Sequence, residues 1–117
     1  MDWKYLLTSY QGRINRAKFW AGIGILIATG IVINILDAAL GLHIGEHPIG
    51  ILAIVSMPFY IFLALALYTK RWHDRDKSGW WSLIGLVPVV GGVWLLVELG
   101  ILEGTRGANR FGPDPLA

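Results

Sequence analysis

The chain has 117 residues, of which 55% are hydrophobic and only 15% are charged. A soluble domain of this length could not bury so much apolar surface, so the composition argues against an ordinary soluble fold and favours a membrane protein. A soluble helical domain that dimerises through its apolar faces is the alternative, and we disfavour it because such helices would still have a polar face. Cysteine is absent, which excludes disulfides and thiolate metal sites.

Three apolar runs predict an all-α fold, a single integral-membrane domain over residues 1–117 with three transmembrane helices. The helices are expected at about 19–42, 49–69 and 80–102, followed by an irregular tail over 103–117. The first run has no charge until Asp37. A cleavable signal peptide is disfavoured there because mostly polar residues precede the run and no distinct cleavage site follows a short core. The second run contains Pro58, which predicts a kink.

The third run has two interpretations because Pro88, Gly91 and Gly92 interrupt it. It could cross the membrane once as a kinked helix, or enter and return as a re-entrant pair of half-helices. Non-helical backbone inside a membrane needs cover from other protein, and two companion helices offer little. We therefore expect a single kinked crossing.

The basic residues predict the orientation. Four of them precede the first run and four follow the second, whereas the connection over residues 41–48 has none. The positive-inside rule then places the N-terminus and the loop after the second helix in the cytoplasm. The tail with Arg106 and Arg110 lies outside after a single crossing and inside after a re-entrant one. The basic residues that give a pI near 9.2 are thus explained by membrane orientation, and we expect no nucleic-acid partner.

The N-terminal segment has apolar residues at helical spacing from Trp3 to Ile14, which predicts a short interfacial helix with its apolar face in the lipid. Asn15 is the expected N-cap of the first spanning helix, and Ser78 that of the third. Aromatic pairs follow both caps, at Phe19-Trp20 and Trp80-Trp81, and they are expected to lie at headgroup depth.

Three segments resemble the signatures of domain-of-unknown-function family 805, a family of small, uncharacterised bacterial inner-membrane proteins. They are GRINRAKFW at 12–20, RWHDRDKSGWW at 71–81 and GTRGANRFGPDP at 104–115. Lys18, Trp72, Asp76 and Phe111 depart from the commonest family pattern. The resemblance covers nearly the whole chain and implies the fold and a location in the bacterial inner membrane, multi-pass, but no activity.

These segments supply the candidate functional residues. The loop motif contributes Arg71, His73, Asp74, Ser78, Trp80 and Trp81; the N-terminal motif contributes Gly12, Arg13, Asn15, Arg16, Phe19 and Trp20; the C-terminal motif contributes Gly107, Asn109, Arg110 and Gly112. His73 and Asp74 are adjacent, so on a helix they point in different directions and cannot form a catalytic dyad. Arg71 or Lys70 is spaced to pair with Asp74. The motif is thus either structural or a site for anionic lipid headgroups or a partner protein. We expect the tail to dock on the bundle.

Asn34, Asp37 and Glu98 are polar residues within apolar runs, which makes them candidates for an ion or proton path. After a single crossing, Asp37 and Glu98 would lie level with each other near the outer boundary. His43 to His47 spells H-x-x-E-H, but flanking glycines and a proline favour a turn, so we expect no metal site.

A stripe of small residues, Ala17, Ala21, Gly24 and Ala28, is expected to pack against the second helix. No catalytic constellation is recognisable, and we expect neither an enzyme nor a cofactor. The sequence favours a binding, assembly or envelope-associated membrane component, with the lipid bilayer, a second copy or another membrane protein as partner. The alternative is a small proton-sensitive transporter or channel-like subunit that uses Asp37, Asn34 and Glu98.

Overall fold

The computed structural model describes residues 2–43, 45–46 and 49–116. Within these ranges the chain is helical, and no β-strand is formed. The elements in chain order are α1 (Trp3–Thr8), α2 (Arg16–Leu40), α3 (Ile51–Asp74), the 3₁₀-helix η1 (Gly79–Leu86), α4 (Val90–Leu95) and the π-helix η2 (Leu96–Ile101). The H-x-x-E-H segment includes residues 44 and 47, which lie outside the described ranges.

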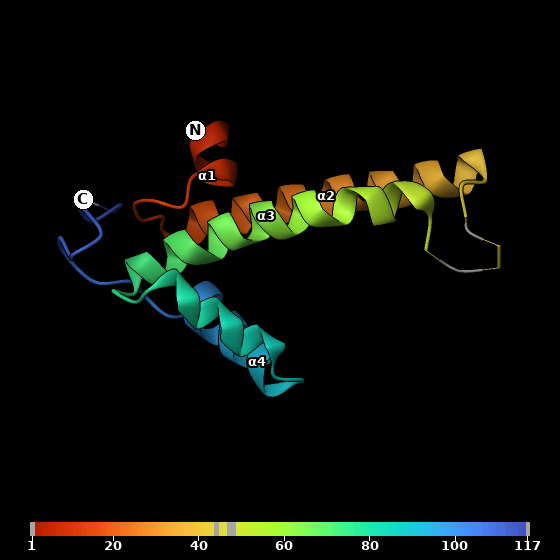
Figure 1. Cartoon of the computed structure of the whole chain (residues 1–117). Coiled ribbons are helices and arrows are strands. Elements are labelled where there is room, and N and C mark those ends of the chain that lie inside the picture. The colour runs from red at the N-terminus through yellow and green to blue at the C-terminus, as the bar shows by residue number, and fades with distance from the viewer. Residues whose placement is uncertain (1, 44, 47–48, 117) are drawn as a thin grey trace.

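Helices α2 and α3 run antiparallel, side by side (Figure 1). As the sequence predicts, Asn15 is the N-cap of α2, and its side chain accepts a hydrogen bond from Lys18 N at 2.9 Å. Gly22 allows close approach, because a Cβ atom there would lie 2.5 Å from Leu67 Cδ2. Helix α3 continues through Pro58 as one helix. With 25 and 24 residues, both helices exceed the roughly 20 residues that a membrane span needs.

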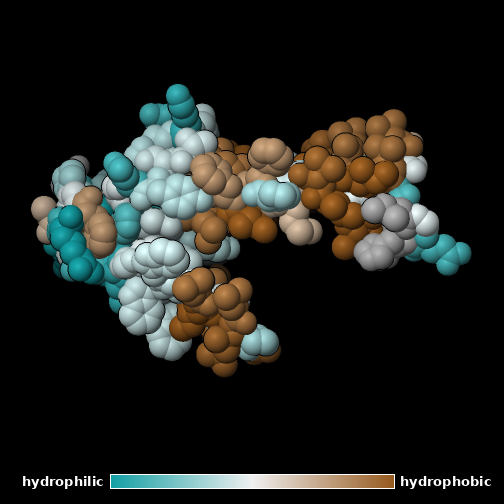
Figure 2. Space-filling view, in the orientation of Figure 1, coloured by the Kyte–Doolittle hydropathy of each residue, from teal (hydrophilic) through white to brown (hydrophobic). Residues whose placement is uncertain are grey.

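The apolar parts of both helices have almost no protein around them. Only 6% of the most apolar window of α2 and 11% of that of α3 are buried, so neither is the core helix of a soluble protein. Ile35 is 59% exposed and Phe59 is 68% exposed. Figure 2 shows the resulting apolar surface, with most of the hydrophilic residues in view gathered at the opposite end of the bundle. This distribution fits a helical pair surrounded by lipid.

The third run does not form the single kinked helix that we predicted. Residues 79–101 form a hairpin in which η1 leaves the end of α3 and α4–η2 returns to it (Figure 1). Each limb is short: the eight residues of η1 extend over about 16 Å, well below the roughly 30 Å of a hydrocarbon core. Thr105 N donates to Asp74 O at 2.6 Å, so the chain after the hairpin returns to the C-terminal end of α3. Within the described ranges, two helices are long and apolar enough to span a membrane.

The hairpin turns at Pro88 and Val89. Pro88 has no N–H to donate, and Val89 takes a φ of +65°, a conformation that β-branched residues rarely adopt. The limbs meet at Gly91, where a Cβ atom would lie only 1.9 Å from Ile84 O. The glycine is therefore what allows the two limbs to approach.

The N-terminal helix packs differently from the prediction. Leu6 and Ile14, expected to face lipid, are each 1% exposed and belong to the protein core with Phe19, Leu67, Trp72 and Leu99. Helix α1 thus packs on the end of α3. Trp3 alone of the large apolar residues of α1 stays substantially exposed, at 46%.

The small-residue stripe also differs. Gly24 and Ala28 are exposed, and a Cβ atom at Gly24 would meet nothing within 4 Å. The face of α2 that contacts α3 contains Gly22 and Thr29, whose hydroxyl lies 2.5 Å from that of Tyr60. The prediction chose the wrong face of α2 as the face that contacts α3, because small residues occur on both faces of this helix.

Candidate functional site at the polar end

The three signature segments meet at one end of the bundle, which we call the polar end. It comprises the C-terminal end of α3, the chain before α2 and residues 98–112, and it is the hydrophilic region in Figure 2. Residues separated by 99 positions in sequence, Arg13 and Gly112, are joined there by a hydrogen bond of 3.1 Å. The beginning and the end of the chain thus meet at this surface.

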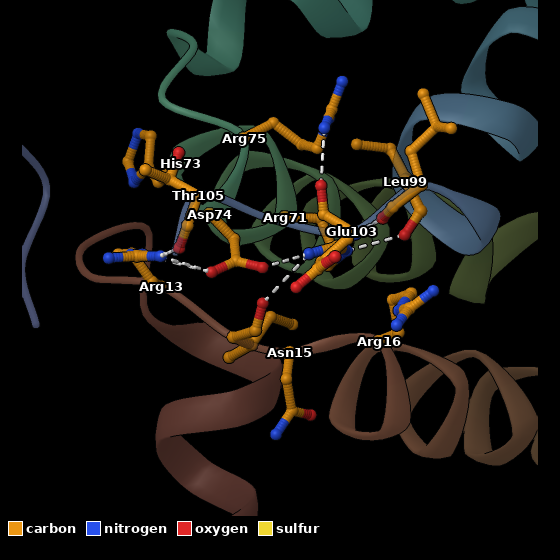
Figure 3. Close-up of polar contacts among 12 residues, drawn as sticks. Arg13, Asn15, Arg16, Arg71, His73, Asp74, Arg75, Leu99, Glu103 and Thr105 are labelled. Atoms are coloured by element: carbon orange, nitrogen blue, oxygen red, sulfur yellow. Dashed lines mark hydrogen bonds and ion pairs between the residues drawn. The ribbon is translucent and has the colours of Figure 1, made fainter. Parts of the chain in front are cut away.

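At its centre is a buried cluster of Arg13, Arg71 and Asp74, which we call the Arg–Asp cluster (Figure 3). One Asp74 carboxylate oxygen accepts from Arg13, with Arg13 Nη2 at 2.9 Å, and the other accepts from Arg71. Arg71 is fully buried and Asp74 is 4% exposed. Buried ions of this kind are retained only when they are paired and fully hydrogen-bonded.

Backbone carbonyl groups occupy the remaining arginine donors. Arg71 donates to Leu99 O at 2.6 Å and to Leu102 O at 2.8 Å, and so holds the returning limb of the hairpin. Arg13 donates to Thr105 O at 2.6 Å and to Gly107 O at 2.8 Å, and so holds the tail. The predicted pairing of Arg71 with Asp74 is confirmed, and the pair has a clear structural role.

Lys70 performs a similar task for α1. It is fully buried, and its Nζ donates to the carbonyl oxygens of Tyr5, Leu6 and Ser9 at 2.9, 2.7 and 2.5 Å. These carbonyls lie at the C-terminal end of α1, where helical N–H partners run out; Tyr5 O also accepts from Ser9 N at 3.1 Å. A cation there also interacts favourably with the helix dipole.

His73 and Asp74 do not contact each other. His73 Nδ1 lies 2.9 Å from Gly12 O, and the imidazole stacks on Phe111 with ring centroids 3.9 Å apart. Asn109 Nδ2 donates to His73 O at 2.9 Å. The tail therefore docks on the bundle, as predicted, and His73 is one of its supports.

Glu98 lies at the polar end and not near Asp37. Its carboxylate accepts from Arg75 Nε at 3.0 Å and from Lys77 Nζ at 2.9 Å. At the other end of α3, Asp37 is 1% exposed and accepts from Leu52 N at 2.9 Å and Ala53 N at 3.0 Å. Nearly the whole of α3, about 36 Å, separates the two carboxylates.

Asp37 thus acts as a cap for α3, whose own N-cap is Gly50 with no side-chain oxygen. Asn34 Nδ2 donates to Gly30 O within its own helix at 2.8 Å. The prediction that Asp37 and Glu98 lie level with each other is therefore wrong.

The remaining motif residues are divided between anchoring and support. Trp20 Nε1 donates to Gly100 O at 2.9 Å, and Arg16 donates to Ile101 O at 2.8 Å, so both hold η2. Ser78 is the N-cap of η1 and accepts from Trp80 N at 3.3 Å. Trp80 is 78% exposed, in keeping with the predicted position at the membrane surface.

On the face of α3 that carries Thr69 and His73 lies an open groove of about 410 Å³ between α3, η1 and the segment after α1. Its lining residues are Tyr10, Leu65, Thr69, His73, Ser78, Gly79, Trp80, Ser82 and Leu83. The Tyr10 hydroxyl donates to Phe62 O at 2.5 Å, which fixes one wall. Burial raises the pKa of the Tyr10 phenol, so it remains protonated and able to make this bond.

The motifs pointed to His73, Ser78 and Trp80, and the groove contains all three. Tyr10, Leu65, Thr69, Ser82 and Leu83 were not predicted, because no spacing rule brings an N-terminal tyrosine to the middle of α3. Leu65, Thr69 and His73 are spaced four residues apart on one helix face, which is a local signal that could have linked these three lining residues. Among the described residues, no group of three or more His, Cys, Asp and Glu side chains is arranged to hold a metal ion.

Two long lipid-exposed helices, closed at one end by a buried ionic cluster, define a helical integral membrane protein. Residues 7–113 match a family described as a protein of unknown function, DUF805. The chain belongs to this family.

Two relatives from Escherichia coli strain K12 are inner membrane proteins. The inner membrane protein YhaH is 37% identical over 121 residues, covering 98% of this chain and 97% of its own. The inner membrane protein YhaI is 37% identical over 106 residues, covering 91% and 85%. The uncharacterized protein YiiR of the same strain is 28% identical, covering 92% and 86%. No solved structure matches the chain.

Proposed function

We propose that this protein is a non-enzymatic binding component of the inner membrane, whose polar end presents a preformed groove on the cytoplasmic side. In this topology α2 and α3 cross the membrane, the hairpin enters the cytoplasmic leaflet and returns, and both termini are cytoplasmic. All ten Lys and Arg residues then lie on the cytoplasmic side, in accord with the positive-inside rule.

The observation that carries the proposal is how the Arg–Asp cluster uses its charges. The arginine donors described above are directed to Asp74 and to backbone carbonyls, so the cluster holds the segments together rather than presenting a reactive group. The cluster fixes the end of α3 from which His73 lines the groove, and such preorganisation lowers the cost of binding. We prefer this function to a proton-sensitive path, because Asp37 and Glu98 lie far apart and each is held by its own partners.

Crosslinking from the groove tests the proposal. A photoreactive amino acid in place of Trp80, in the full chain in its native membrane, is expected to capture one discrete lipid or protein species. The matched control places the same group at Ile35, which is 59% exposed on the outer half of α2. Capture of the same bulk lipids at both positions, or of nothing at Trp80, would contradict a binding function for the polar end.

A further inference from the structure

The groove changes in polarity along its length. Leu65, Thr69 and His73 lie on one face of α3 at successive helical turns, so the lining passes from apolar to polar over about 12 Å. The direction is the same as that of a bilayer leaflet, since Leu65 is nearer the middle of α3 and His73 is at the polar end. Leu83 and Trp80 on η1 form the opposite wall, again with the aromatic residue nearer the polar end.

The polar half of the groove offers hydrogen-bond donors and no acidic residue. Thr69, Ser78 and Ser82 contribute hydroxyl groups. Ser82 Oγ is buried and has no hydrogen-bond partner within the described part of the chain. A buried polar atom without a partner is unfavourable unless something outside the protein bonds it.

No acidic side chain lines this part of the groove. Phe111 stacks on the His73 imidazole, and the Arg110 guanidinium carbon lies 5.0 Å from the Phe111 ring centroid. Arg110 is itself paired with Asp76. Asp74 is already neutralised by two arginines. A phosphate would meet hydroxyl donors without a facing carboxylate.

We infer that the groove binds one phospholipid, with its phosphate at the Thr69–Ser78–Ser82 hydroxyls and the start of an acyl chain along Leu65 and Leu83. The groove's volume of about 410 Å³ holds only the headgroup-proximal part of such a molecule, and its open side lets the remaining chain continue into the membrane. This inference rests on the binding function proposed above and names its ligand class.

Lipid titration of the purified full chain in detergent, followed by native mass spectrometry, tests the inference. The probes are phosphatidylglycerol, phosphatidylethanolamine and a diacylglycerol with the same acyl chains. One phospholipid per chain is expected to bind about tenfold more tightly than diacylglycerol, because a hydrogen bond to a charged group contributes roughly that factor. Equal binding of diacylglycerol would contradict the phosphate site. Displacement of phospholipid by sodium phosphate alone would contradict the inference that the ligand is a lipid.

A matched pair of variants locates the site. Leu83→Trp fills the groove and is expected to weaken phospholipid binding about tenfold, since one lost hydrophobic contact of this size is worth that much. Leu86→Trp, on the same 3₁₀-helix but outside the groove and 80% exposed, should bind as the unaltered protein does. Thr69→Val should weaken phospholipid but not diacylglycerol. If Leu83→Trp binds normally, the groove is not the site.

The two proposals fail separately. Capture of an identified protein, and no phospholipid, from position 80 would leave the binding function standing and overturn the lipid inference. Capture of neither would contradict both.

Discussion

Asp74→Asn should destabilise the protein by about 3–5 kcal/mol, because it leaves two buried guanidinium groups without a carboxylate. Arg13 and Arg71 have side chains that are 1% and 0% exposed, so water cannot replace the lost charge. The free energy of unfolding of the purified chain in detergent measures the effect. The loss should be accompanied by exposure of the tail to protease, since Arg13 also holds Thr105 and Gly107.

Asp76→Asn is the matched control. Asp76 lies two residues after Asp74 and pairs with Arg110. The side chains of Asp76 and Arg110 are 47% and 64% exposed, and such surface pairs contribute at most about 1 kcal/mol. Equal effects of the two substitutions would contradict a buried ionic cluster. In a double-mutant cycle, Arg13→Gln and Asp74→Asn should together cost less than the sum of their separate losses, because the two side chains share one interaction.

Gly91→Ala should open the hairpin, whereas Gly92→Ala should be tolerated. A Cβ atom at Gly91 would lie 1.9 Å from Ile84 O and 3.0 Å from Gly85 Cα, both backbone atoms of the facing limb that cannot rotate away. A Cβ atom at Gly92 meets nothing within 4 Å. Overpacking of this kind costs about 1–3 kcal/mol, and more where backbone must move.

These neighbouring glycines distinguish the hairpin from a single crossing. In one continuous helix, either alanine would favour helix formation by up to about 1 kcal/mol. The two folds therefore predict opposite changes in the free energy of unfolding for Gly91→Ala, with Gly92→Ala, measured in the same detergent, as the comparison. A stabilising effect at both positions would contradict the hairpin.

The parts of the fold that depend on local chemistry could be predicted. Asn15 and Ser78 are caps because each has a side-chain oxygen next to a run of helix-forming residues. The two spanning helices follow from uninterrupted apolar length. The limits were off by a few residues, most at the end of α3. Lys70 and Arg71 are buried within this helix because Lys70 donates to backbone carbonyls and Arg71 is paired with Asp74.

The parts that depend on distant contacts could not be predicted. Pro88, Gly91 and Gly92 are compatible with a kink or a turn, and the positive φ of Val89 has no residue preference to reveal it. Basic residues at a helix end indicate orientation, so nothing in the pattern distinguishes buried Arg71 from the more exposed Arg75. The groove needs residues from α1's end, α3 and η1 together, which is why only its motif residues were foreseen.

The side of the membrane reached by a reporter fused after Ala117 tests the central claim most directly. The hairpin and the docked tail place the residues around Thr105 and Gly107 at the same end as Arg13. We expect a reporter that fluoresces only when folded in the cytoplasm to be active there, and the same reporter inserted at Gly45, in the connection between α2 and α3, to be inactive. A dark fusion after Ala117, with protein present at normal levels and an externally active reporter at the same position, would contradict the account.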